Sequence, residues 1–233
     1  QMSAAGSEKE NAQITNSLES LDQDDPDYLQ GLKLNLGLEG HVDLPKSYEF
    51  FRKAAERGHS LSCTFVGDQY ITGNGVAVDL QEAEKWYKKS MPQLQKLAEQ
   101  GNPTAQIQYG FMFRKGLGVE INDEIAAKWY KKSAEQNYRI GQTQYGFLFY
   151  DGLGSDKKRD FKKAFEWFKK AESQNCPYAQ YILGKMYLYS QGIKGDDKLA
   201  LKFLQKSVAQ NFPPAYIELG VMHLHGWGCE KSE

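Results

Sequence analysis

The sequence predicts an all-α fold, a right-handed α–α superhelix of about five and a half helix-turn-helix repeats of 36 residues each. The first observation is a recurring glycine, at Gly31, Gly67, Gly110, Gly146, Gly184 and Gly220. The second is an aromatic residue that follows after 19 residues, or 21 in one repeat, at Phe50, Trp86, Trp129, Trp167 and Phe203. The third is the interval from that aromatic to the next glycine, which is 17 residues except once, when it is 24. Self-similarity at this period is typical of stacked repeats that bury their apolar faces against their neighbours.

The residues around each repeat glycine have the period of a helix. The positions five before, one before and three after the glycine share one face, as Ala179, Leu183 and Tyr187 do. Three repeats have a proline where the first turn would start, at Pro103, Pro177 and Pro213, where a missing N–H costs nothing. This first helix is predicted to end at a Gly-x-Gly element, because glycine permits the positive φ of a tight reversal.

A second helix is predicted to open seven residues before each repeat aromatic, where a short side chain can accept hydrogen bonds from free N–H groups. These capping residues are Asp43, Asp79, Asn122, Asp160 and Asp196, and Asp79 with Glu82 matches a capping box. The helix is predicted to end at residue types that accept a left-handed conformation, namely Gly58, Gly101, Asn137, Asn175 and Asn211. The signals recur in register, which supports both helices of the repeat.

Two insertions interrupt the period. Residues 91–97 add seven residues to one second helix, which would lengthen it by two turns without rotating its face. Pro92 opposes a straight extension and predicts a kink or a broken helix there. The other insertion lengthens the loop from Ser155 to Asp160, which is rich in lysine and arginine and is expected to be solvated.

The domain organisation follows from the repeats. Residues 1–24 are polar without sustained periodicity, and we expect a disordered or frayed leader. Residues 25–233 are expected to form one repeat domain. Its repeats are approximately 25–59, 60–102, 103–138, 139–176, 177–212 and a partial one at 213–233.

Composition excludes several classes of function. The net charge of -1 gives no bulk attraction to nucleic acid or to an anionic membrane. No apolar run approaches the ~18 residues of a transmembrane helix, and the N-terminus lacks the pattern of a signal peptide. The odd count of three cysteines argues against a disulfide framework. Because stacked repeats offer an extended surface, binding is favoured over catalysis.

Several motifs recur in phase and resemble the Sel-1-like repeat family, which is related to the tetratricopeptide repeats. They are Leu-Gly-x-x-Tyr at Leu183–Tyr187, Gly-x-Gly-Val at Gly73–Val76 and Gly116–Val119, and Trp-Tyr-Lys-Lys-Ser at Trp86–Ser90 and Trp129–Ser133. The resemblance covers residues 27–230 and departs from the pattern in the first repeat, which is expected to act as a cap. It implies a non-catalytic scaffold or adaptor for protein–protein interaction. The excess of 24 Lys over 5 Arg is typical of an AT-rich bacterial genome. Together with the repeat, it leads us to expect a bacterial secreted or translocated protein associated with virulence, in the periplasm or in host cytosol.

By analogy with related superhelices, the concave surface is formed by the face of the first helix opposite its core. This face holds clustered aromatics, which are typical of interaction sites, and predicts a groove for a peptide or partner protein. The predicted groove residues are Ile107, Phe111, Arg114, Thr143, Phe147, Tyr150, Tyr178, Tyr181, Lys185, Leu188 and Tyr189. Alanine at Phe147 or Tyr181 is expected to weaken binding without unfolding the protein. The alternative interpretation is that some of these aromatics pack against the adjacent repeat.

No catalytic, metal or cofactor site is expected. The Gly-x-Gly elements follow helix ends and lack a preceding strand, unlike nucleotide-binding loops. The residues His223, His225 and Cys229 lack the spacing of a metal site. We expect a monomer that binds protein or peptide. Two alternatives stay open: a substrate-docking or regulatory module of a larger enzyme, and a peripheral binder of phosphoinositide or other lipid headgroups through the recurring lysine pairs.

Overall fold

The computed structural model describes residues 25–37, 41–153 and 158–228. Within these ranges the chain forms eleven helices and no strand. The helices are α2 (Pro26–Leu36), α3 (Leu44–Glu56), α4 (Ser60–Thr72), α5 (Leu80–Glu99), α6 (Pro103–Lys115), α7 (Asp123–Glu135), α8 (Arg139–Asp151), α9 (Phe161–Glu172), α10 (Pro177–Leu188), α11 (Asp197–Val208) and α12 (Pro213–His225). The predicted all-α repeat fold is confirmed. The polar leader, residues 155–157 of the lysine-rich loop and Cys229 lie outside the described residues.

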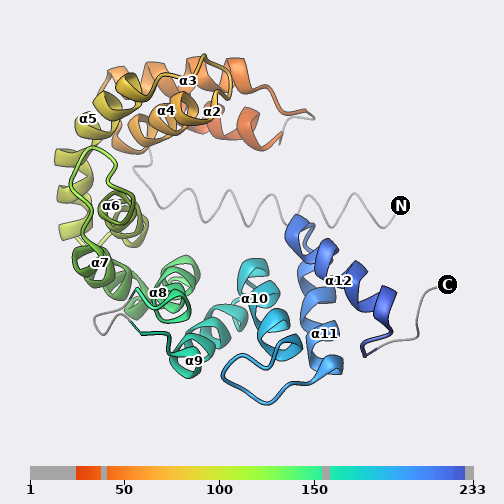
Figure 1. The fold of residues 1–233 in the computed structure, drawn as a ribbon. Coiled ribbons are helices and arrows are strands. Elements are labelled where there is room, and N and C mark those ends of the chain that lie inside the picture. The colour runs from red at the N-terminus through yellow and green to blue at the C-terminus, as the bar shows by residue number, and fades with distance from the viewer. Residues whose placement is uncertain (1–24, 38–40, 154–157, 229–233) are drawn as a thin grey trace. The chain divides into compact units, whose positions relative to one another are not determined.

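The helices fall into two compact units, which we describe separately. Unit 1 ends at Ile121 and contains α2 to α6, and unit 2 begins at Asn122 and contains α7 to α12. Even-numbered helices are the first helices of the repeats and odd-numbered helices are the second. Within each unit, helices that follow one another along the chain lie side by side (Figure 1), as the pairs α4–α5, α8–α9 and α10–α11 do.

The helix boundaries follow the predicted capping signals. The Asp79 carboxylate accepts from the backbone N–H groups of Gln81 and Glu82, both at 3.0 Å. The reciprocal half of the capping box is replaced, because the Asp79 N–H donates to the Tyr70 carbonyl and Glu82 pairs with Lys85. All five predicted helix ends have positive φ, at Gly58, Gly101, Asn137, Asn175 and Asn211. Local hydrogen-bond chemistry therefore places both ends of most helices.

Helix α5 runs unbroken through Pro92 for 20 residues. The break predicted at this proline is wrong and the alternative of a lengthened helix is confirmed, whereas a kink there stays a prediction. Two added turns keep the same face toward the core. Beyond the proline, Leu94 and Ala98 are buried like Ala83 and Tyr87 before it. Burial of this continuous apolar face offsets the hydrogen bond that a proline removes from a helix.

The repeat glycines allow the two helices of a repeat to approach closely. A β-carbon on Gly146 would lie 2.9 Å from the Phe168 ring, and one on Gly184 would lie 2.7 Å from Leu204. A β-carbon added to Gly31 would likewise lie 2.8 Å from the Phe51 ring, and one added to Gly67 would lie 2.8 Å from the Tyr87 ring. The large side chain therefore fills the volume that the glycine leaves, and this explains why the glycine recurs.

Candidate functional site

The predicted groove residues divide between the two units. Helix α6 of unit 1 carries Ile107, Phe111 and Arg114. In unit 2 they lie on α8, on α10 and at Tyr189, the residue that caps α10. Phe111 and Arg114 are half-buried. The group in unit 2 is larger, and its aromatic rings contact one another.

Three of the predicted groove residues are buried, which corrects the expectation that they face solvent. Ile107 is 8% exposed, Thr143 2% and Phe147 9%. The Phe147 ring lies 5.0 Å from the Phe168 ring and 5.0 Å from the Tyr178 ring, measured between centroids. Side chains of successive first helices thus cover each other in unit 2. Alanine at Phe147 is now expected to destabilise the fold, because it would leave a cavity in the core.

Four tyrosines of unit 2 form what we call the tyrosine face: Tyr150 on α8, Tyr178 and Tyr181 on α10, and Tyr189 at its end. Tyr178 is 38% exposed and Tyr189 is 48% exposed, whereas Tyr150 and Tyr181 are half-buried. The rings of Tyr178 and Tyr181 are stacked at 6.3 Å. Phe212 supports both rings from the start of α12, at 5.4 and 5.6 Å.

Hydrogen bonds hold the outer tyrosines in place. The Tyr150 hydroxyl donates to Gln191 Oε1 at 2.7 Å, and the Tyr189 hydroxyl donates to Glu218 Oε2 at 2.9 Å. Desolvation and this bond to Glu218 raise the pKa of Tyr189 above its usual value. The Lys185 ammonium lies 3.7 Å from Glu218 Oε1 and 5.4 Å from the centre of the Tyr181 ring. The exposed rings are therefore preorganised, which reduces the entropy lost when a partner binds.

Sequence reasoning missed the supporting residues Gln191, Glu218 and Phe212. Gln191 and Glu218 each lie in a different repeat from the tyrosine that they hold, 41 and 29 residues away, and Phe212 lies at the opposite end of the repeat that begins with Tyr178 and Tyr181. No local pattern marks such a pairing. Only the register of one repeat on the next brings these side chains together.

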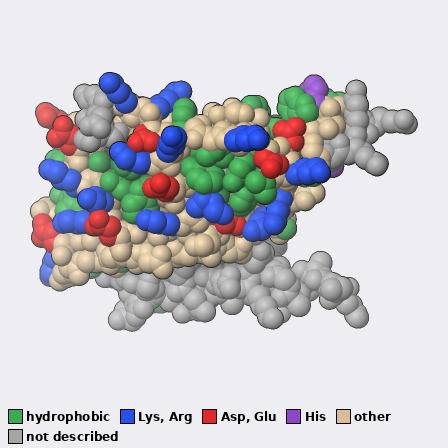
Figure 2. Space-filling view, turned by 90° about the horizontal axis from the view of Figure 1, so that it is seen from below, with side chains coloured by type: hydrophobic (Ala, Val, Ile, Leu, Met, Phe, Trp, Pro, Cys, Tyr) green, Lys and Arg blue, Asp and Glu red, His purple; other side chains and the backbone are tan. Residues whose placement is uncertain are grey.

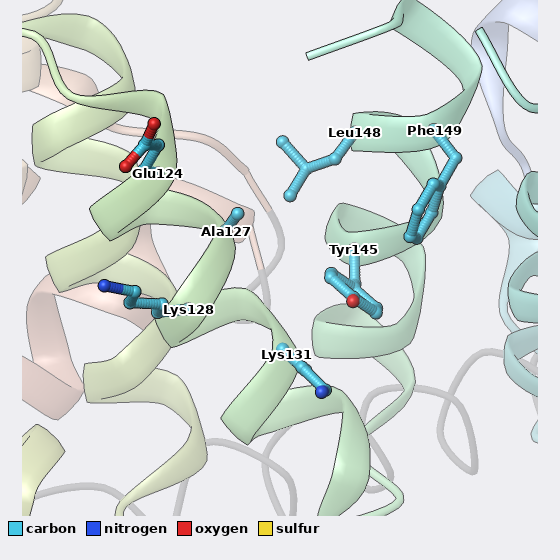
Figure 3. Close-up of a pocket in the computed structure, with 7 residues that line it drawn as sticks. All are labelled: Glu124, Ala127, Lys128, Lys131, Tyr145, Leu148 and Phe149. Atoms are coloured by element: carbon cyan, nitrogen blue, oxygen red, sulfur yellow. The ribbon is translucent and has the colours of Figure 1, made fainter. Parts of the chain in front are cut away.

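A cavity of about 340 Å³ lies between α7 and α8 in unit 2. Its walls are Ala127 of α7 and Tyr145, Leu148 and Phe149 of α8. Figure 3 shows Ala127 and Leu148 pointing toward each other across the gap between the two helices. Glu124, Lys128 and Lys131 line it from α7, so the lining carries both signs of charge.

The recurring lysine pairs have partners within their own helices. The second lysine of three pairs lies over the repeat tryptophan, with the ammonium 4.7 Å from the Trp86 ring, 4.1 Å from Trp129 and 3.9 Å from Trp167. The first lysine of these pairs meets a glutamate at Lys88–Glu84, Lys131–Glu135 and Lys169–Glu172. Figure 2 shows basic and acidic side chains interspersed around apolar patches on one face. Such a mixed surface does not favour the lipid-headgroup alternative.

The described part of the chain has neither a membrane-spanning helix nor a metal-binding cluster. None of its helices combines the length and apolar content needed to cross a bilayer. Its His, Cys, Asp and Glu side chains include no group of three placed to hold a metal ion.

Comparison with known proteins places these features in context. The model for the Sel1 repeat matches residues 28–59, 60–90, 103–138, 140–176, 177–212 and 213–233. The comparison with curated proteins finds no match. A crystal structure of a Sel1 repeat protein from Oxalobacter formigenes is similar to this chain, at 26% identity and a TM-score of 0.62, over 88% of this chain and 79% of that one.

Two other crystal structures are similar. The protective antigen c5321 of uropathogenic Escherichia coli, described as having an SLR fold, is 29% identical with a TM-score of 0.54 over 96% of this chain. This chain spans only 45% of the length of that antigen. The immunity protein Pa5087 of Pseudomonas aeruginosa is 23% identical with a TM-score of 0.55, over 84% of this chain and 70% of that one. The last similarity concerns the fold alone.

Proposed function

We propose that this chain, which belongs to the Sel1 repeat family of protein-interaction scaffolds, binds a peptide or partner protein through the tyrosine face of unit 2. The observation that supports it is a set of four tyrosine rings, two exposed and two half-buried, that neighbouring side chains hold in place. Tyrosine gives a large amphipathic contact area at low cost in side-chain entropy and is enriched among the residues that dominate binding energy.

The proposed contact surface is narrower than the predicted groove. It comprises Tyr150, Tyr178, Tyr181, Lys185, Leu188 and Tyr189 in unit 2, with Phe111 and Arg114 as a separate candidate patch in unit 1. Lys185 and Glu218 add a cation and a carboxylate beside the rings, which suits a partner segment with both apolar and polar side chains. The buried Phe147 would support the tyrosine face from beneath, since its ring packs against Tyr178.

An affinity capture with a matched control tests the proposal. The double variant Tyr178→Ala/Tyr189→Ala should lose at least ten-fold in the yield of a specific partner. The control is Tyr216→Ala on α12, since Tyr216 is 49% exposed and lies outside the tyrosine face. Circular dichroism melting should show that both variants stay folded. Equal capture by the double variant and by the wild type would contradict the proposal.

The biological setting is also proposed. We infer a non-catalytic role for a bacterial secreted or host-facing protein. The similarity to a bacterial protective antigen supports this inference, as does the lysine-rich composition with 24 Lys against 5 Arg. Detection of the protein in culture medium or on intact cells by protease accessibility would test it, and an exclusively cytosolic protein would refute it.

A further inference from the structure

The cavity between α7 and α8 is lined on its α7 side by a small side chain, Ala127. At two other junctions, α3–α4 and α9–α10, the residue two positions before the repeat aromatic packs against the residue three positions after the next repeat glycine. At the α7–α8 junction these two positions are held by Ala127 and Phe149, and both residues line the cavity. Alanine leaves the Phe149 side of the space open.

Two other junctions in the chain fill the same place with a ring of their own. Between α3 and α4 the pair is Tyr48 and Tyr70, whose ring centroids are 5.8 Å apart and whose hydroxyls are 2.8 Å apart. Between α9 and α10 it is Phe165 and Tyr187, again with centroids 5.8 Å apart in an edge-to-face arrangement. The repeat architecture therefore accepts an aromatic ring at this place, and the α7–α8 junction lacks the one that the chain would supply.

The chemistry of the cavity favours a ring over a charged ligand. Leu148 at its base is fully buried, and Tyr145 and Phe149 give it aromatic walls. The Phe149 ring is 5.1 Å from Tyr145, and the Lys163 ammonium lies 5.5 Å from its centre. The charges around it largely cancel, because Lys131 meets Glu135 at 3.7 Å and Lys163 meets Asp160 at 3.1 Å. The volume of 340 Å³ is at the lower end of the range for ligand sites, about 300–1,000 Å³.

We infer that the α7–α8 cavity is a second docking site, which takes an aromatic side chain from a partner polypeptide in the place that Phe165 occupies at the α9–α10 junction. The incoming ring would meet Phe149 edge to face, as Phe165 meets Tyr187. This inference does not rest on the tyrosine face, which is formed by other residues of unit 2.

Methyl NMR with a defined probe tests the inference. The probe is the peptide acetyl-Gly-Ser-Phe-Ser-Gly-amide, and its control has alanine in place of phenylalanine. We expect the phenylalanine peptide to shift the methyl signals of Ala127 and Leu148 and to bind at least ten-fold more tightly than the alanine peptide. Equal binding of the two peptides, or no shift of these methyls at millimolar probe, overturns the inference.

Filling the cavity from within gives the sharper experiment. Ala127→Phe should abolish probe binding, lowering the affinity at least ten-fold, while the melting temperature stays the same or rises. Ala127→Leu is the second variant, for the case that a phenylalanine ring does not fit. Leucine is chosen because Leu201 holds the equivalent position in the fifth repeat. Ala127→Ser keeps the size of alanine and should bind as the wild type does. A folded Ala127→Phe or Ala127→Leu protein that binds the probe normally overturns the inference.

Three more measurements separate this site from its alternatives. Tyr178→Ala/Tyr189→Ala should leave probe binding unchanged, so the tyrosine-face proposal and this one can fail independently. If p-cresol binds the cavity and the peptide does not, the site takes free small aromatics and the polypeptide partner is refuted. If the protein dimerises in ultracentrifugation and Ala127→Phe abolishes the dimer, the occupant is a second copy of this chain, which also refutes a foreign partner.

Discussion

The first repeat and the fourth and fifth repeats close the base of their helix pair in chemically different ways. In each, the residue seven positions after the repeat aromatic reaches back to the start of the first helix. In the first repeat Arg57 Nη2 bonds Asp25 and Asp27, both at 2.6 Å, and we call this set the ionic clasp. Repeats four and five use neutral amides only, and we call these sets the amide clasps.

The two amide clasps are copies of one another. Gln174 Nε2 donates to Gln142 Oε1 at 2.8 Å and to Asn137 Oδ1 at 3.2 Å. In the fifth repeat Gln210 donates to Gln180 at 2.7 Å and to Asn175 at 3.2 Å. In both, the glutamine of the first helix also donates to the asparagine, at 2.9 and 3.0 Å.

The repeat geometry thus brings the end of the second helix to the start of the first helix in all three repeats. The side chains at this contact decide whether its strength depends on pH and salt. The ionic clasp lies partly in solvent, so it depends on pH and salt. The amide clasps have no titrating group, and Gln142 and Gln180 are buried. Four substitutions probe this contrast, in order of decreasing expected effect.

Gln180→Ala should have the largest effect, lowering the free energy of unfolding by about 2–3 kcal/mol. The substitution leaves a cavity at a fully buried site and takes the partner from Asn175 and Gln210. Urea unfolding followed by circular dichroism measures the loss. The matched control is Gln210→Ala, which is half-exposed and should cost less than half as much. Equal losses would show that burial does not decide the strength of this clasp.

Arg57→Gln should lower the melting temperature by about 1–3 °C at pH 7 and by progressively less as the pH falls below about 4. Partial burial would raise the pKa of Asp25, but hydrogen bonds from Arg57 and from the backbone lower it below its ordinary 3.8. A lowered pKa means that the folded state favours the carboxylate, so the contribution is present above about pH 4 and is lost as the pH falls further. Melting of both proteins across pH 3–7 measures the difference, and a pH-independent difference would contradict the ionic interpretation.

Arg57→Gln combined with Asp25→Asn should convert the ionic clasp into an amide one. The new pair can form amide hydrogen bonds, and asparagine also caps a helix N-terminus, as Asp25 does for Asp27 and Tyr28. We expect at least half of the stability lost in Arg57→Gln to return, without the pH dependence of the wild type. The same melting series checks this, and a double variant less stable than Arg57→Gln would argue against the analogy.

Asn175→Gly should change the free energy of unfolding by no more than about 0.5 kcal/mol. The variant loses an acceptor of the amide clasp, but Asn175 has a φ of 58°, a conformation that glycine adopts without strain. Gly58 and Gly101 hold the equivalent position in the first two repeats. Comparing the urea unfolding of Asn175→Gly and Asn175→Ala separates the loss of the acceptor from the cost of the positive φ. Both variants lose the acceptor, but only alanine has a β-carbon that is strained at this φ. An alanine variant as stable as the glycine variant would show that φ is unimportant here.

Local chemistry made most of the fold predictable. The N-caps from Asp43 to Asp196 and the left-handed ends from Gly58 to Asn211 depend on neighbours within a few residues, so their signals can be read from the sequence. The same reasoning failed at Pro92, because the outcome depends on how well the two added turns pack. Leu94 and Ala98 are buried there, and propensity alone does not reveal this.

The surfaces were less predictable because they depend on register between repeats. Phe147 and Tyr150 lie three residues apart on α8, yet the first is buried by Phe168 and Tyr178 and the second is held near the surface by Gln191. Predicting the cavity requires knowing that Ala127 and Phe149 line the same gap between α7 and α8. Alignment of the repeats would have marked Ala127 as small where Tyr48 and Phe165 are large.

The tryptophans that lie under lysines in the second helices give the molecule built-in optical reporters. Trp86, Trp129 and Trp167 occupy the same position in three consecutive repeats, and Trp227 follows α12. Replacing three of the four by phenylalanine leaves one fluorophore at a known place in the array. Stopped-flow emission from such a set would follow each segment separately and reveal whether unfolding starts at one end or engages the whole array at once.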